Sequence, residues 1–204
     1  MEQNYEVLQK LPYFNKVTLG DVLDKSGENL NYWIKKLIRE GGLIVLKKGL
    51  YVARLYLLTL EKNPSLREGY LEYLANIIRY PSYISLEYVL SKYGLIPEGV
   101  FAITSVTLKS SRVYKNSLGN FIYRNIKEEM FFGFADRDFE GKRLKMATKA
   151  KALFDFLYYK KAISLNDLRI NWEVFLPSDK EEFAAIVKKS DSPKMERVLR
   201  NLKW

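Results

Sequence analysis

The stretch from Ser26 to Val52 reads S-G-E-N-L-N-Y-W-I-K-K-L-I-R-E-G-G-L-I-V-L-K-K-G-L-Y-V. At about 100° per residue, its first half separates apolar from polar side chains on the two sides of a helix. The apolar side gathers around Leu30 and comprises Trp33, Ile34, Leu37 and Ile38. The polar side carries Asn31, Tyr32, Lys35, Lys36 and Arg39. We therefore expect a helix from Glu28 to Arg39 with one face in a core and one cationic face.

The second half of the stretch has the pattern of a β-hairpin. The pair Gly41-Gly42 favours the end of the helix, because glycine accepts the left-handed backbone found there. Two short β-prone runs follow, 43–46 and 50–53, joined by Lys47-Lys48-Gly49. We expect Tyr51, in the second run, to lie in the core.

A helix followed by a hairpin with a basic tip is typical of the winged helix-turn-helix. Such a helix fits the major groove of DNA, while basic hairpin side chains meet phosphates. The predicted DNA-binding residues are Asn31, Tyr32, Lys35, Lys36, Arg39, Lys47 and Lys48. A solvated helix face is the alternative explanation for the charges, and Asn31 and Tyr32 could instead cap or pack.

The composition limits the chemistry open to the chain. Its 204 residues include neither Cys nor His, which removes thiolate catalysis, disulfides and the commonest metal ligands. We accordingly expect no enzyme activity, no metal and no cofactor. The net charge of +10 favours a polyanionic partner such as nucleic acid. No apolar run reaches the roughly 20 residues of a membrane span and no signal peptide is evident, so we expect a cytoplasmic protein that avoids membranes.

Shorter patterns extend the predicted fold on both sides of the opening stretch. Before it, we expect helices over 5–11 and 19–25, the second begun by a capping box of Thr18 and Asp21. After it, residues 54–63 suggest a mostly apolar, helical connector. The predicted domains are a winged helix-turn-helix over 1–54, a connector over 55–64 and a larger α/β domain over 65–204. The fold class is α+β.

Within the larger domain, we expect a small antiparallel sheet flanked by helices. The expected strands are 100–108, 112–115, 121–126 and 130–134. The expected helices are one from 65 that ends before Pro81, one capped by Ser85 that runs to Tyr93, one from Thr148 to Tyr159, one over 178–189 begun by a capping box at Ser178, and one begun by Ser192-Pro193.

Other charged groups in this domain allow more than one interpretation. Lys149, Lys151, Arg197 and Arg200 form a possible partner or nucleic-acid surface. Asp155 lies in an apolar helix face and could be a buried anchor for a nearby cation. The run Asp136-Arg137-Asp138-Phe139-Glu140 could hold a divalent cation through its carboxylates, although a charged hairpin turn explains it better.

Five blocks of the sequence resemble the AbiEi family, the antitoxins and transcriptional regulators of type IV toxin-antitoxin systems in abortive infection and phage defence. The blocks are G-G-L-I-V-L-K-K-G-L-Y-V (Gly41 to Val52), Y-I-S-L-E-Y-V-L-S-K-Y-G-L-I-P (Tyr83 to Pro97), T-S-V-T (Thr104 to Thr107), F-F-G-F (Phe131 to Phe134) and A-T-K-A-K-A-L-F-D-F-L-Y (Ala147 to Tyr158). One departure is that Lys149 and Ala150 stand where the family usually has Pro and Glu.

The resemblance implies a repressor that binds inverted repeats in its own promoter through the winged helix. It also implies a C-terminal domain that opposes a nucleotidyltransferase-type toxin without an obligatory stable complex. Two other interpretations stay open at this point. One is a protein-interaction module that uses the basic C-terminal region, and the other is a metal-dependent nuclease or transferase that uses Asp136, Asp138 and Glu140.

Overall fold

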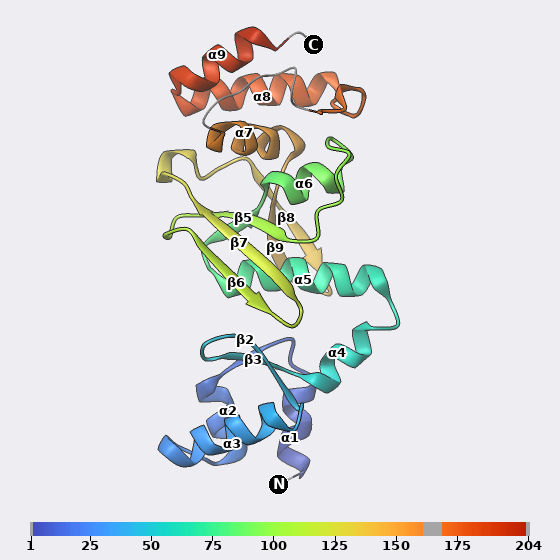
Figure 1. The fold of residues 1–204 in the computed structure, drawn as a ribbon, viewed down its shortest axis with the longest axis vertical. Coiled ribbons are helices and arrows are strands. Elements are labelled where there is room, and N and C mark those ends of the chain that lie inside the picture. The colour runs from blue at the N-terminus through green and yellow to red at the C-terminus, as the bar shows by residue number, and fades with distance from the viewer. Residues whose placement is uncertain (1, 161–168, 203–204) are drawn as a thin grey trace. The chain divides into compact units, whose positions relative to one another are not determined.

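The computed structural model describes residues 2–160 and 169–202, which are mixed α/β (Figure 1). The chain divides into two compact units. Unit 1 comprises Met1–Leu71 with Tyr114–Leu118, and unit 2 comprises Glu72–Val113 with Gly119–Trp204. In the described part of the chain, every helix is too short or too polar to span a bilayer.

Unit 1 places helices beside a small antiparallel sheet. Its elements are α1 (Glu2–Gln9), β1 (Phe14–Asn15), α2 (Lys16–Leu23), α3 (Gly27–Arg39), β2 (Leu43–Lys47), β3 (Leu50–Ala53), α4 (Arg54–Leu60) and the first part of α5 (Pro64–Ile78). The sheet has the strand order β1-β3-β2, and both pairings are antiparallel. Its core is formed by Leu8, Phe14, Leu19, Leu30, Ile34, Leu43, Tyr51 and Ala53.

The helix and hairpin predicted from the opening stretch are confirmed. Gly41 adopts a left-handed φ of 74°, and the Gly42 amide donates to the Leu37 carbonyl over 2.9 Å, which ends α3. Gly49, with a φ of 78°, allows the turn between β2 and β3. Tyr51 is buried as expected, whereas Ile38, expected on the apolar side, is 37% exposed.

The start of α2 corrects the predicted capping box. Asn15 caps the helix through its side-chain oxygen, which accepts from the Thr18 amide over 2.9 Å. Thr18 therefore lies inside the first turn, and its hydroxyl also donates to that Asn15 oxygen. The helix begins three residues earlier than expected, because asparagine serves as well as threonine at this position.

Unit 2 is built on a larger mixed sheet. The strands of this sheet are β4 (Ser82–Ile84), β5 (Ile103–Thr107), β6 (Arg112–Asn116), β7 (Gly119–Asn125), β8 (Phe134–Phe139) and β9 (Lys142–Ala147), in the order β6-β7-β5-β4-β9-β8. The part of β6 from Tyr114 onward belongs to unit 1. The other elements of unit 2 are the remainder of α5, α6 (Leu86–Lys92), η1 (Glu128–Met130), α7 (Lys149–Tyr159), η3 (Trp172–Val174), α8 (Pro177–Ser190) and α9 (Pro193–Asn201). Figure 1 shows α7, α8 and α9 stacked in layers beyond α6.

The prediction of an antiparallel sheet in this domain is wrong. The β4/β5 and β8/β9 pairs are antiparallel, but β4/β9 and β5/β7 are parallel. We did not anticipate β4 and β9, and β4 joins the two parts of the sheet. The segment expected as a strand over 130–134 instead contains the end of η1, and β8 begins only at Phe134.

Helix caps in unit 2 divide into confirmed and corrected predictions. The Thr148 and Ser192 side chains cap α7 and α9 as expected. Helix α8 begins at Pro177, before the predicted Ser178 cap, and the Asp179 carboxylate accepts from the Leu176 amide over 2.9 Å. Ser85 precedes α6, but its hydroxyl makes no cap and is used elsewhere.

Candidate functional site

The polar face of α3 is directed to solvent in unit 1. Asn31, Tyr32, Lys35 and Arg39 are exposed, Tyr32 to 59%. Lys36 is half-buried, because its ammonium lies 4.6 Å from the ring centroid of Trp33. The face therefore offers amide, phenol, ammonium and guanidinium groups on a helix whose other side packs in the core.

A lysine from the neighbouring helix orients one of these groups. Lys16, the first residue of α2, donates from its ammonium to Asn31 Oδ1 over 2.7 Å. An ammonium has only donors, so the amide oxygen must face Lys16 and the amide nitrogen must face away. Asn31 thus directs its NH₂ group away from Lys16. We did not predict this contact, since nothing in the spacing of Lys16 and Asn31 indicates it.

The two hairpin lysines differ in their surroundings. Lys48 is exposed in the turn, whereas Lys47 ends β2 and is half-buried. The pairing register shifts between Val45 and Lys47, which marks an irregularity beside the turn. Asn116, which belongs to the same unit, donates from its side-chain amide to the Leu46 carbonyl over 3.0 Å.

The four basic residues predicted as a second surface differ in their exposure. Arg197 and Arg200 are exposed on α9. Lys149 is paired with the Asp179 carboxylate at 2.6 Å and donates to the Val174 carbonyl. Lys151 is fully buried, so its prediction as a surface residue is wrong.

Lys151 belongs instead to a buried polar cluster that joins α7 to β4. Its ammonium lies 2.8 Å from Asp155 Oδ1 and donates to the Met130 carbonyl over 2.9 Å. The other Asp155 oxygen accepts from the Ser85 hydroxyl at 2.7 Å and from the Tyr83 hydroxyl at 3.0 Å. Burial raises the pKa of the Asp155 carboxyl, and the Lys151 ammonium opposes that rise. The prediction that Asp155 anchors a buried cation is confirmed.

Aromatic rings and one glycine complete the surroundings of Lys151. Its ammonium lies 4.7 Å from the Phe154 ring centroid and 4.9 Å from that of Phe132. Its aliphatic stem crosses Gly133, where an added Cβ would lie 2.9 Å from Lys151 Cγ. Gly133 also has a left-handed φ of 78°. Gly133, the glycine of the F-F-G-F block, thus suits its position for two reasons: the backbone there is left-handed, and a side chain would collide with Lys151.

The acidic run forms a hairpin with β9. Asp136 pairs with Lys145 at 3.2 Å, and Asp138 accepts from the Gly141 amide across the turn. Glu140 lies in the turn with a φ of 48°. Across residues 2–160 and 169–202, no three acidic side chains are grouped so as to hold a metal ion. The hairpin explanation of this run is therefore confirmed.

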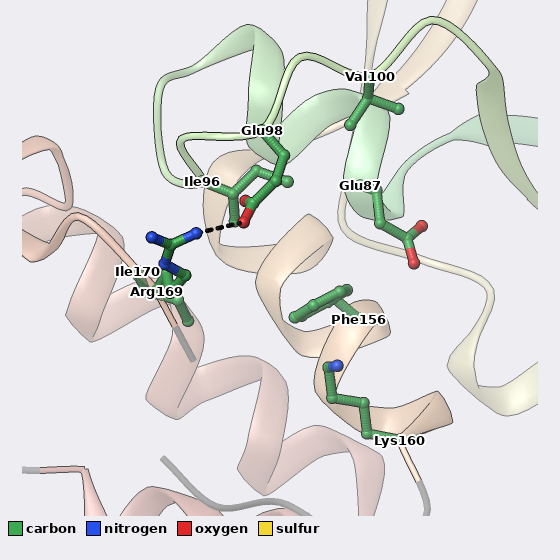
Figure 2. A pocket seen from close by; sticks show the side chains of 8 residues that line it. All are labelled: Glu87, Ile96, Glu98, Val100, Phe156, Lys160, Arg169 and Ile170. Carbon is green, nitrogen blue, oxygen red and sulfur yellow. Dashed lines mark ion pairs between the residues drawn. The ribbon is translucent and has the colours of Figure 1, made fainter. Parts of the chain in front are cut away.

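Unit 2 also contains an open pocket of about 260 Å³ at the end of α7. It is lined by Glu87, Ile96, Glu98, Val100, Phe156, Lys160, Arg169 and Ile170. Figure 2 shows the Phe156 ring between Glu87 on one side and the Glu98–Arg169 ion pair on the other. The Lys160 ammonium lies 4.5 Å from the Phe156 ring centroid. The pocket thus has an apolar floor and a rim of both charges.

Comparison of the chain with models of protein families gives no match. Comparison with curated proteins likewise gives none.

Proposed function

We propose that the chain is a sequence-specific DNA-binding transcriptional regulator, with unit 1 as a winged helix-turn-helix. The observation that carries the proposal is the polar face of α3, which is exposed while the opposite face packs in the core. The same core holds β2 and β3, and the hairpin that they form carries Lys47 at the end of β2 and Lys48 in the turn. A positively charged helix beside a basic hairpin suits a duplex, since the groove takes the helix and the phosphates take the lysines.

In the proposed complex, α3 enters the major groove and its side chains contact base edges. Lys35 donates to acceptors such as guanine O6 and N7. Asn31 donates through its NH₂ group, because the hydrogen bond from Lys16 holds its oxygen on the side of α2. An acceptor on the base edge is therefore the expected partner of the NH₂ group, such as adenine N7.

The biological role that we propose is that of an antitoxin which represses its own promoter. Support for this part is the resemblance to the AbiEi family in blocks from both units, together with the basic charge of the chain. On this proposal, unit 1 binds inverted repeats, and unit 2 opposes a nucleotidyltransferase-type toxin without a lasting complex. Co-expression with a nucleotidyltransferase encoded beside the gene tests it, since the antitoxin should restore growth.

Fluorescence anisotropy with the DNA upstream of the coding sequence tests the DNA-binding proposal. We expect tighter binding to this DNA than to a scrambled duplex, with a steep loss of affinity as salt rises. Changing Lys47 and Lys48 to Ala should weaken binding to both duplexes and reduce the slope of log K against log salt by up to about two. The matched control changes Lys188 and Lys189, two adjacent exposed lysines of α8, to Ala.

Each outcome of this titration bears on one part of the proposal. Equal affinity for the upstream and scrambled duplexes would refute sequence-specific binding and favour a protein-interaction module that uses Arg197 and Arg200. An unchanged salt slope in the Lys47 and Lys48 variant would refute the proposed phosphate contact of the hairpin, but not the proposed contact of α3 with the bases. A control variant that lowers the slope equally would move the DNA contact to unit 2.

A further inference from the structure

Phe101 is an unusual side chain for the surface of a folded unit. It lies in the loop between α6 and β5, and it is 95% exposed, more than any other large apolar residue of the described chain. Both neighbouring elements are buried, since α6 contributes Val89 and Leu90 to the core and β5 contributes Val106. The loop therefore presents an aromatic ring to solvent from a well-packed base. Leaving such a ring in water forgoes the gain of burying it.

The loop that carries Phe101 also contributes to the lining of the pocket at the end of α7. Glu98 and Val100, from the same loop, form part of its lining (Figure 2). The Phe101 ring lies along that loop, because a Cβ on Gly99 would be 4.0 Å from Phe101 Cζ. The exposed aromatic side chain thus follows two residues of the pocket lining, Glu98 and Val100, directly along the chain.

The pocket has the size and floor that a phenyl ring needs. Its volume of about 260 Å³ exceeds the roughly 150 Å³ of an apolar cavity that takes up benzene. Phe156 forms the floor, and Ile96, Val100 and Ile170 supply apolar walls. A ring placed there would stack on or against Phe156, an arrangement that aromatic pairs favour.

The charges on the rim match a second copy of the same surface. Glu87 and Glu98 are acidic, whereas Lys160 and Arg169 are basic. Glu98 and Arg169 form an ion pair within the chain at 3.6 Å, and both side chains are largely exposed. Such a pair contributes little stability, so Glu98 of one copy can pair with Arg169 of the other at little cost. A two-fold axis places the same patch on both sides of an interface, and each acidic group can then meet a basic one.

We propose that two copies of the chain associate through this surface, with the Phe101 ring of each copy in the pocket of the other. The arrangement is isologous, because the ring and the pocket belong to one patch and a two-fold axis makes both contacts at once. The interface does not depend on DNA binding. If unit 1 does bind DNA, the dimer supplies the two-fold symmetry that inverted repeats require.

Sedimentation equilibrium of the wild-type chain and of Phe101→Ser tests the proposal. Burying one phenylalanine changes an equilibrium constant by roughly tenfold to a hundredfold, and the dimer buries two. We therefore expect the dimer dissociation constant of the variant to rise by about a hundredfold or more. Tyr80→Ser is the matched control, since Tyr80 is 69% exposed in unit 2 and is not one of the residues that line the pocket. Circular dichroism confirms that each variant is folded.

Charge reversal tests the two-fold arrangement without touching the ring. Glu98→Arg and Arg169→Glu should each weaken the homodimer, because like charges then face each other twice. An equimolar mixture of the two variants should dimerise more tightly than either variant alone, since a mixed dimer brings opposite charges together at both contacts. A wild-type chain that stays monomeric at its highest soluble concentration would overturn the proposal. So would a dimer that Phe101→Ser and Tyr80→Ser weaken equally, or a mixture no tighter than its components.

Discussion

Replacing Asp155 by Ala should be among the most destabilising single changes in unit 2. Asp155 and Lys151 are both fully buried, and their charged atoms are 2.8 Å apart. Among the described residues, the substitution leaves the ammonium in a largely aromatic surrounding with the Met130 carbonyl as its remaining hydrogen-bond acceptor. It also takes the acceptor away from the hydroxyls of Tyr83 and Ser85.

The expected cost follows from the burial of the pair. Breaking a buried ion pair by removing one partner costs about 3–5 kcal/mol, because the remaining charge is uncompensated. For a chain of about this length, each kcal/mol lowers Tm by about 2–4 °C, so the fall should be roughly 6–20 °C. Asp136→Ala is the matched control, since Asp136 also pairs with a lysine but is 47% exposed. Its cost should stay below about 1 kcal/mol.

Urea unfolding followed by circular dichroism measures both variants, and a double-mutant cycle with Lys151→Met completes the assay. Methionine keeps the apolar stem and removes the charge. The Lys151→Met/Asp155→Ala double variant should therefore be more stable than Asp155→Ala alone, because no orphaned ammonium remains. If Asp155→Ala costs no more than Asp136→Ala, or if the double variant is the least stable of the set, the burial argument is refuted.

The same pair gives Lys151→Met a defined pH dependence. Burial raises the pKa of the Asp155 carboxyl above its ordinary 3.8, and Lys151 is the strongest opposing influence. Without Lys151, this pKa rises further, so the native state keeps a proton that the unfolded chain has released. Stability then falls as pH rises between the unfolded and native pKa values. The stability of Lys151→Met should be closest to that of the wild type in acid, and the difference between them should grow towards neutral pH.

Two further predictions concern a glycine and a lysine. Gly133→Ala should lower the free energy of unfolding by about 2–4 kcal/mol, because the new Cβ meets the Lys151 stem in a left-handed backbone. Gly141→Ala is the control, since Gly141 has a similar φ of 75° but open space around it. Urea unfolding should show a smaller loss of stability for Gly141→Ala than for Gly133→Ala. On the proposed DNA-binding function, Lys16→Met should relax base discrimination at the position that Asn31 is proposed to contact, as measured by selection from randomised DNA. The control is Lys48→Met in the hairpin, which removes the same charge. It should lower the affinity for DNA and leave base discrimination at that position unchanged.

The features of unit 1 that could be predicted from the sequence are those specified by close neighbours along the chain. Helix α3 follows from apolar side chains at helical spacing, and the hairpin follows from strand-prone runs around a glycine turn. The start of α2 could not be placed, because Asn15 and Thr18 are both good caps and only the folded backbone selects one. The hydrogen bond from Lys16 to Asn31 needs α2 and α3 side by side, which no local pattern contains.

The topology of unit 2 was beyond prediction for a similar reason. Strand β4 has only three residues, and β9 reads K-R-L-K-M-A, so neither has a strong strand pattern. Both are nevertheless central, since β4 pairs with β5 on one side and with β9 on the other. Parallel pairing between strands far apart in the chain depends on the whole sheet. Contacts between a strand and a helix depend on the fold in the same way. The Thr104 hydroxyl on β5, for example, accepts from the Tyr88 amide in the first turn of α6.

Lys151 and Asp155 show where sequence patterns become ambiguous for site residues. A lysine and an aspartate four residues apart on a helix fit an exposed ion pair and a buried one equally well. The spacing alone therefore supported two incompatible predictions, a surface role for Lys151 and a buried role for Asp155. What decides between them is Gly133, which leaves room for the lysine stem, and the rings that surround its ammonium. A buried ion pair needs all of its hydrogen-bond partners in place, so Tyr83, Ser85 and the Met130 carbonyl must be correctly positioned before the pair can form.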